Sequence, residues 1–451
     1  MKSLIRNISF LILISLGFSS CVHDFYPDGE GENGKIDPNS TILFLDLRAL
    51  NPSTMTTPAE KIKSVRVIII GNESNEEETD ADGSDNAGGT PASKGIVECN
   101  RLYEFPIVNA SNFDYTLTWQ STLGTKSIYV IANEESIAGD ISTILDGYVE
   151  TENAGDLEQW LADYKFNPEY TAEGDAIYLP YSYSKTDFVP LPGKVNTVNC
   201  WLVPVATKFV FYFENYRENQ VNIDGISMAY TNSMNYLLAH LGPDEINKPY
   251  NGEELYWVDW LAKISEESWN NPGFSQNEFF NKQVGWIQDY YVPTPGDSHE
   301  YVFFKNDGSE LIQVKGGTKE SDDPKAEIDP GTFTSKIFYI PESVNYRVPG
   351  TDNEPEGADN DEESEDEGQT FYLTMQIVDT GDNSSPPFVD VPVPNLSALF
   401  RNTYVVISMT FKEGEIEVYA EIAPWNEKQA NGWVNEGNAP SNNPFTIKKK
   451  W

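Results

Sequence analysis

The chain has 451 residues, of which 39% are hydrophobic and 13% aromatic, which is enough for roughly two or three domains with apolar cores. Its 71 Asp and Glu residues outnumber its 30 Lys and Arg residues, and the net charge of -41 disfavours nucleic acid as a partner. Three Cys and three His are too few for a dense disulfide framework and disfavour histidine-based metal or acid–base sites.

The amino terminus predicts a lipoprotein signal peptide over residues 1–20. Lys2 and Arg6 precede an apolar run, residues 8–18, that is too short to cross a bilayer but has the length of a signal-peptide core. Two Ser residues then lead into Cys21, an arrangement that resembles a bacterial lipobox, in which the Cys thiol is acylated. The alternative is an ordinary signal peptide with an incidental Cys.

A lipid on Cys21 would hold the protein at the cell surface, on the outer membrane. Residues 21–40 are rich in Gly, Asp, Glu and Pro and show no hydrophobic period, so they predict a flexible tether. The remaining sequence holds no second apolar run long enough to cross a membrane.

The first strand is predicted over Thr41–Leu50, where apolar side chains alternate with others. The residues that share the apolar face are Leu43, Leu45, Leu47 and Ala49. Such alternation is typical of a strand that buries one of its two faces.

Residues 41–205 predict a first domain of β-strands with short helices. The β-branched runs 64–70 and 127–132 predict strands that are buried on both faces. Between them, residues 73–89 are acidic and rich in Gly and Ser, which indicates a solvated loop. Apolar residues spaced by three and four over residues 143–164 predict short helices packed on the sheet.

Residues 206–451 predict a second β-sandwich domain. Three Phe residues alternate with other side chains over residues 208–213, and two further strand patterns cover 404–411 and 416–422. The segment 412–414, which contains Gly, predicts a short hairpin turn between the last two strands. Antiparallel hairpins of this kind build sandwiches.

Two inserts interrupt the second domain. Residues 352–367 hold ten acids and no base, so they predict a mobile loop. Residues 251–291 are rich in Trp and Tyr and most simply form a small core of their own. The alternative is a platform of Trp257, Trp260 and Trp286 that stacks on sugar rings, as in a glycan-binding surface lipoprotein. Retardation of the protein in a gel containing surface polysaccharides would support this alternative.

Several short sequence segments, spread over most of the chain, resemble those of a known family. They are the lipobox ending in Cys21, the strands Thr41–Leu50 and Ile62–Ile70, and the segments Ile128–Asn133, Val203–Phe211, Phe338–Glu342, Phe400–Ile407 and Pro424-Trp425. In this order and spacing they resemble the type V pilins, or fimbrillins, of Bacteroidales. The resemblance implies a mostly β fold of two transthyretin-like Greek-key β-sandwich domains in tandem.

The resemblance also implies a function. Such proteins are non-enzymatic fimbrial (pilus) subunits or anchors that serve adhesion to host or bacterial surface ligands, and their partners are other fimbrial subunits. In stalk and tip subunits a protease cuts after an Arg or Lys, the first strand leaves, and the groove accepts a strand donated by the next subunit. Anchor subunits keep the lipid and the first strand.

By this resemblance Arg48 is the candidate processing site, and Leu43, Leu45 and Leu47 would leave with the exchanged strand. The alternative is that Arg48 is an ordinary residue on the wet face of a strand, which is poorly cleavable when folded.

Two further features leave alternatives open. Cys99 and Cys200 would form a disulfide in an oxidising space or remain separate buried thiols. The tail 445–451, which is apolar and then basic, is either a donor strand or a solvated end. The sequence contains no nucleotide, zinc or hydrolase motif, and Asp80–Asp85 lacks the EF-hand pattern. No enzymatic activity, metal or cofactor is therefore expected.

Overall fold

The structure is a computed structural model that describes residues 39–49, 57–72, 95–137, 141–166, 178–231, 234–238, 249–250, 253–254, 299–305, 311–319, 321, 327–344, 372–378, 388–392, 398–399, 401–424 and 447–450. The signal peptide, Cys21, the tether up to residue 38, the acidic insert and the three Trp of the candidate glycan platform lie outside these residues. Strands dominate the described part of the chain, which confirms the prediction of a mostly β fold.

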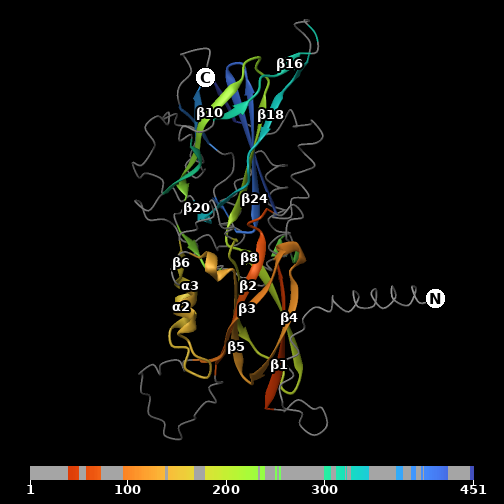
Figure 1. The fold of residues 1–451 in the computed structure, drawn as a ribbon, viewed down its shortest axis with the longest axis vertical. Coiled ribbons are helices and arrows are strands. Elements are labelled where there is room, and N and C mark those ends of the chain that lie inside the picture. The colour runs from red at the N-terminus through yellow and green to blue at the C-terminus, as the bar shows by residue number, and fades with distance from the viewer. Residues whose placement is uncertain are drawn as a thin grey trace, which may run out of the picture.

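The first half of the chain forms a seven-stranded sheet around one core (Figure 1). Its strands are β1 (Ser40–Ala49), β2 (Lys61–Asn72), β3 (Ile96–Asn109), β4 (Asp114–Thr122), β5 (Thr125–Ala132), β7 (Tyr181–Phe188) and β8 (Val195–Pro204). Their spatial order is β3-β2-β5-β7-β8-β1-β4. All neighbours are antiparallel except β1 and β8, which are parallel. The first strand of the chain therefore lies inside the sheet.

The two faces of β2 pack against different partners. Val65, Val67 and Ile69 join the core that β1 also faces, whereas Ile68 and Ile70 lie on the opposite face. All five are at most 1% exposed. The strand is buried on both faces, as its β-branched sequence predicted, because helices cover its outer side.

The covering layer consists of short helical segments: η2 (Glu134–Ser136), α2 (Ile141–Asp146) and α3 (Leu157–Asp163). A further short helix, η1 (Ala110–Asn112), connects β3 to β4 and buries Ala110 in the core that β1 faces. Figure 1 shows α2 and α3 along one side of the sheet. The residues that these two helices bury are Ile141, Leu145, Leu157 and Leu161. Short helices packed on the sheet were predicted, and they are present. Beside them, β6 (Lys165–Phe166) pairs with β11 (Asn235–Tyr236).

The second half packs two sheets face to face. One contains β10 (Val221–Thr231), β14 (His299–Lys305), β15 (Ile312–Val314), β21 (Tyr372–Val378) and β22 (Phe388–Pro392), in the order β14-β10-β21-β22 with β15 also on β10. The other contains β9 (Thr207–Asn215), β18 (Gly331–Thr334), β19 (Phe338–Ile340), β24 (Thr403–Lys412), β25 (Glu415–Pro424) and β26 (Ile447–Lys450), in the order β18-β9-β24-β25-β26 with β19 also on β9. Phe211 and Ile407 of this sheet share one core with Ile223 and Met375 of the first, so the sheets form a sandwich.

The hairpin of β24 and β25 has the predicted short turn. Lys412 pairs with Glu415, so Glu413 and Gly414 form the turn, and Gly414 has a φ of 76° that suits glycine. Three small ladders complete the described strands: β12 (Pro249–Tyr250) with β13 (Glu253–Glu254), β16 (Thr318–Lys319) with β17 (Ile328–Asp329), and β20 (Ser343–Val344) with β23 (Ala398–Leu399).

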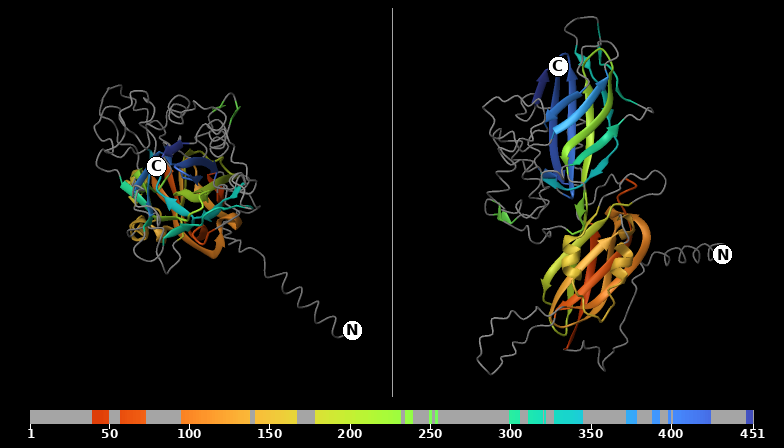
Figure 2. Two further views of the ribbon diagram at one scale, coloured as in Figure 1. Left: turned by 90° about the horizontal axis from the view of Figure 1, so that it is seen from above. Right: turned by 90° about the vertical axis from the view of Figure 1, so that its left-hand side faces the viewer.

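The two sets of sheets are stacked end to end along the long axis of the molecule (Figures 1 and 2). Between β8 and β9 the chain passes through Val205 and Ala206, which are fully buried. Leu237 and Leu238, from the later part of the chain, pack with the helical layer of the first half. The domain boundary near residue 205 stays a prediction.

Candidate functional site

The first strand lies between two neighbours, and its leucines fill the core beneath it. The backbone of β1 pairs with β8 on one side and with β4 on the other along nearly its whole length. Leu43, Leu45 and Leu47 are each at most 1% exposed, and Ala49 is 5% exposed. The alternation read from the sequence is therefore present, with the leucines on the buried face.

The beginning of β1 is fixed by the turn that connects β7 to β8. The Thr41 hydroxyl lies 3.3 and 3.1 Å from the carbonyl oxygens of Leu191 and Lys194, to which it can donate. Asn196 Nδ2 donates to Thr41 Oγ1 at 2.7 Å, and the N–H of Ile42 donates to the Lys194 carbonyl at 3.1 Å. These contacts set the register of β1 against β8.

Arg48 lies on the outer face of β1 and is tied to β4. Its Nε donates to Asp114 Oδ1 at 2.9 Å, and about half of the Arg48 side chain is exposed. The sequence left open whether Arg48 is a processing site or an ordinary residue on the wet face of a strand. In the structure the backbone at Arg48 is paired on both sides, with Asp114 and with Trp201. A protease would therefore require the end of β1 to unpair before cleavage.

The cysteines of the first half are separate thiols. Cys99 on β3 and Cys200 on β8 are not joined by a disulfide and are at most 1% exposed, which agrees with the alternative of separate buried thiols. Burial raises the pKa of the Cys99 thiol to about 12. Cys200 lies beside Leu47 in the parallel pair of β8 and β1, so loss of β1 would uncover its thiol.

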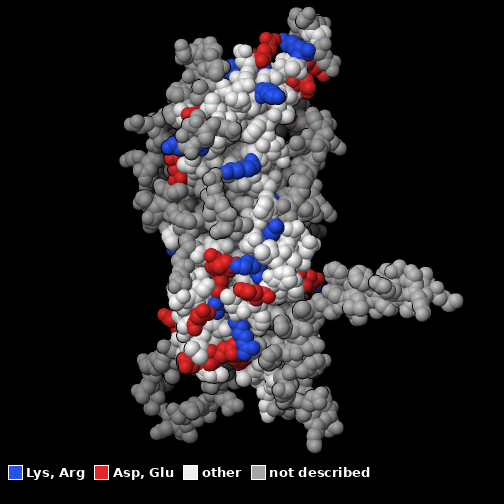
Figure 3. All heavy atoms as spheres, in the orientation of Figure 1, with Lys and Arg blue, Asp and Glu red and all other residues white. Residues whose placement is uncertain are grey.

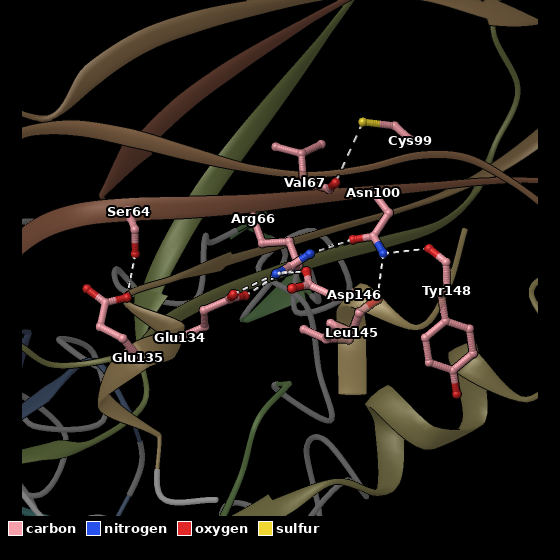
Figure 4. A network of polar contacts seen from close by, with 10 residues as sticks. All are labelled: Ser64, Arg66, Val67, Cys99, Asn100, Glu134, Glu135, Leu145, Asp146 and Tyr148. Carbon is pink, nitrogen blue, oxygen red and sulfur yellow. Dashed lines mark hydrogen bonds and ion pairs between the residues drawn. The ribbon is translucent and has the colours of Figure 1, made fainter. Parts of the chain in front are cut away.

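A buried Arg holds the helical layer on the outer side of the sheet (Figure 4). Arg66 of β2 has 2% of its side chain exposed and donates two hydrogen bonds of 2.7 Å to Glu134 of η2. It also donates to Asp146 of α2 at 2.7 Å and to Asn100 of β3 at 3.0 Å. Because bidentate Arg–carboxylate pairs are directional, this network orients η2 and α2 on the sheet.

A second buried ion pair joins the first half of the chain to the second. Glu60, immediately before β2, lies 3.0 Å from Nζ of Lys208 on β9, and both side chains are at most 1% exposed. Tyr339 of β19 donates to the same carboxylate at 2.7 Å and contacts the Thr57 hydroxyl. Burial raises the pKa of Tyr339 above its ordinary value, so the phenol keeps the proton that it donates.

Arg401, just before β24, adds a third polar connection. Its guanidinium pairs with Glu342, and the Arg401 N–H donates to Glu342 Oε1 at 3.1 Å. Nη1 reaches Ser182 of β7 at 3.3 Å, and Nη2 donates to the carbonyl of Tyr236 at 2.9 Å. Directional contacts of this kind connect the two halves in addition to apolar packing.

Sequence reasoning missed these connecting residues. The available signal was Lys208 at the start of a strand of alternating Phe residues, where a buried cation requires an opposite charge. In a chain with 71 acids, the partner Glu60 could not be selected by pattern.

The carboxyl tail lies at a sheet edge in its own chain. Its described part is β26, which pairs antiparallel with β25. The register places Lys448 and Lys450 opposite Glu417 and Glu415. A tail acting as a donor strand would first have to leave this edge.

The described residues show neither a membrane helix nor a metal cluster. No described helix is long and apolar enough to cross a membrane, and no three described His, Cys, Asp or Glu residues are placed to hold a metal ion. On the face in Figure 3, acidic and basic side chains of the lower half lie among one another. The coloured part of this face therefore offers no continuous basic surface for an anionic partner.

Comparison with known proteins places fimbrial proteins among the structural neighbours. No family model and no curated protein matches the chain. The tip fimbrial protein Mfa3 from Porphyromonas gingivalis, with a C-terminal truncation, is 10% identical, with a TM-score of 0.42 over 86% of this chain and 100% of that chain. A fimbrial assembly protein from Parabacteroides distasonis is 10% identical, with a TM-score of 0.37 over 85% of this chain and 98% of that chain. Because these TM-scores are below 0.5, the likeness to these structures carries no argument about function.

Proposed function

We propose that the protein is a cell-surface fimbrial subunit or anchor, without enzymatic activity, that assembles with other fimbrial subunits by β-strand exchange and serves adhesion. The observation that carries the proposal is the inner position of β1, with three buried leucines and backbone pairing on both sides. The resemblance of the sequence to the fimbrillins supports it as well.

Withdrawal of β1 would create a groove suited to another strand. Its walls would be the backbones of β8 and β4, whose N–H and C=O groups would lose their partners. Its floor would contain the spaces left by Leu43, Leu45 and Leu47. A donated strand with alternating apolar residues satisfies the backbone groups and fills these spaces at once.

Lipidation at Cys21 would attach the protein to the outer membrane. We expect Cys21→Ala to move the protein from the membrane fraction to the soluble fraction, because the acyl chains that hold it would be absent. Cell fractionation followed by immunoblotting measures the change, with Ser20→Ala as the control that stays with the membrane. A Cys21→Ala protein that remains membrane-bound would contradict the lipoprotein assignment.

The amino-terminal residue of protein recovered from the cell surface tests the fimbrial role. A terminus at Ala49 indicates cleavage after Arg48 and a polymerising subunit, and in that case Arg48→Ala should abolish this terminus and lower the yield of assembled fimbriae. An acylated Cys21 in protein that purifies with fimbriae indicates an anchor. Protein with neither terminus that is also absent from purified fimbriae would overturn the proposal.

A further inference from the structure

Departure of β1 would remove the sheet neighbour of β4. The two ends of the seven-stranded order are β3 and β4. Among the described strands, β3 pairs with β2 alone and β4 pairs with β1 alone. Without β1, no described backbone pairing would hold β4 at the distance that an incoming strand requires. Strand exchange therefore needs another way to keep this wall of the groove in place.

Side chains connect β3 to β4 at three levels, although the two strands do not pair. At the first level, the ring centroid of Phe105 on β3 lies 4.5 Å from that of Tyr115 on β4 and 5.3 Å from that of Phe113. Phe113 and Tyr115 are themselves 4.9 Å apart. Aromatic clusters at these distances are attractive beyond the area that they bury.

At the second level, a cation lies over an indole ring. Cζ of Arg101 on β3 is 4.6 Å from the centroid of Trp119 on β4, a distance that allows a cation–π interaction. The Glu150 carboxylate holds the Arg101 guanidinium there by accepting hydrogen bonds of 2.8 and 3.0 Å from Arg101 Nε and Nη2. These hydrogen bonds raise the pKa of Arg101 and lower that of Glu150, so both groups remain charged.

At the third level, a carboxylate bridges the strands. Glu98 on β3 accepts hydrogen bonds from the hydroxyl groups of Ser121 and Thr122 on β4. Lys126, which is fully buried, donates to the same carboxylate at 2.7 Å and to the Thr122 hydroxyl at 3.0 Å. The far end of β4 is thus tied to β3 by charge-assisted hydrogen bonds.

Resting on the proposed function, we infer that these contacts form a β4 clamp that holds β4 in place when β1 is absent and keeps the groove at the width of one strand. The clamp consists of Phe105 with Phe113 and Tyr115, Arg101 with Trp119, and Glu98 with Ser121 and Thr122. In the β1–β4 register, Tyr115 and Trp119 lie opposite Leu47 and Leu43. The clamped side chains therefore also line the groove, and they are positioning residues for the incoming strand.

The clamp can be distinguished from contacts that stabilise the protein equally with and without β1. While β1 is present, its backbone pairing also holds β4 in place. Once β1 is gone, β4 has no sheet neighbour among the described strands, and the clamp adds to its chain connections to η1 and β5 and to the packing of Leu117 on the core. Weakening the clamp should therefore lower the affinity for a rebinding strand far more than it lowers the unfolding free energy of the intact protein.

The test uses the chain from Val22 onward, in which the recognition sequence of a specific protease replaces residues 50–56. The protease cleaves this sequence after the protein has folded, and we call the product the cut protein. A fluorescent peptide with the sequence Ser40–Ala49, the β1 peptide, replaces the severed strand, and anisotropy gives its dissociation constant. We expect Arg101→Gln and Phe105→Leu each to weaken peptide binding about three- to tenfold. Leu102→Ala, at an exposed neighbouring position of β3, is the matched control and should leave binding unchanged.

In the uncut protein, both clamp variants should lose less free energy of unfolding than they lose in peptide binding, because β1 still pairs with β4. Clamp variants that bind the peptide as tightly as the control, or that destabilise the uncut protein as strongly as they weaken binding, would overturn the clamp. If the unmodified cut protein fails to bind the peptide at all, the strand-exchange proposal fails instead.

Hydrogen exchange tests the clamp independently of rebinding. After the severed strand is removed, the β4 amides of the cut protein should keep slower exchange than those of its Arg101→Gln and Phe105→Leu variants. Equal exchange in all of them would show that the clamp does not hold β4.

Discussion

Removing β1 from the cut protein should lower its free energy of unfolding by about 5–9 kcal/mol, because each of three fully buried leucines contributes about 1.5–3 kcal/mol. The side chains lost are those of Leu43, Leu45 and Leu47, all at most 1% exposed. Urea denaturation of the cut protein before and after the strand is stripped away measures the difference. Readdition of the β1 peptide should restore the lost stability. A stripped protein as stable as the uncut one would show that β1 does not fill the core.

The same removal should make one of the two described cysteines reactive. Cys200 lies beside Leu47 and loses its cover, so a thiol reagent should label it in the stripped protein and leave it unlabelled in the uncut protein. Cys99 should stay unlabelled in both, because it lies on β3 and burial raises its pKa to about 12. Cys200→Ser identifies the labelled residue. Labelling that does not depend on β1 would contradict the groove.

Replacing Glu60 by Ala should destabilise the protein by about 3–5 kcal/mol, the usual cost of leaving a buried charge without its partner. The change removes the carboxylate that pairs with Lys208, which is 0% exposed, and that accepts a hydrogen bond from the Tyr339 hydroxyl. Unfolding in urea, followed by tryptophan fluorescence, measures the loss. A loss no larger than that of an exposed ion pair would show that the Glu60–Lys208 pair does not hold the two halves together.

Two controls separate the buried charge from other effects. The double change Glu60→Gln with Lys208→Met removes both charges and should recover much of the stability lost by Glu60→Ala, because no buried charge is then left without an opposite charge. Lys319→Ala removes an ion pair with Glu218, whose side chain is 72% exposed, and should leave the unfolding free energy unchanged. A double variant less stable than Glu60→Ala would show that the charges themselves are required.

The local patterns of the sequence predicted β1, β2, β5 and the short helices of the first half, but not β3, β4 or β7. Alternating leucines in β1 and β-branched runs in β2 and β5 are set by neighbours within one strand, so a short window contains the information. The short helices were predicted for the same reason. A short segment of sequence does not contain the information on which strands pair with β1. Thr41 contacts Leu191, 150 residues away, and the inner position of the first strand follows from such long-range contacts alone.

For the candidate site, too, local features were predicted from the sequence and contacts between distant strands were not. The three leucines were identified as one buried face, whereas the strand pairing on both sides of Arg48 was not visible in the sequence, and cleavage after Arg48 stays a prediction. The β4 clamp was missed because Arg101 and Phe105 look like ordinary residues of a half-buried strand. Their partners Trp119 and Tyr115 lie on a strand that does not pair with theirs.

The central claim, that the groove left by β1 accepts a strand in the register of β1, is tested most directly by disulfide trapping with the native Cys200. Residues opposite each other on neighbouring strands are about 4.8 Å apart, within the Cα–Cα range of about 4.4–6.8 Å that a disulfide spans. The β1 peptide with Leu47→Cys places its thiol beside Cys200, whereas the peptide with Leu45→Cys places it beside Val198. Under mild oxidation we expect the stripped cut protein to cross-link to the first peptide and not to the second, and the uncut protein to cross-link to neither. Equal cross-linking of both peptides, or of neither, would contradict a groove that holds an incoming strand in place of β1.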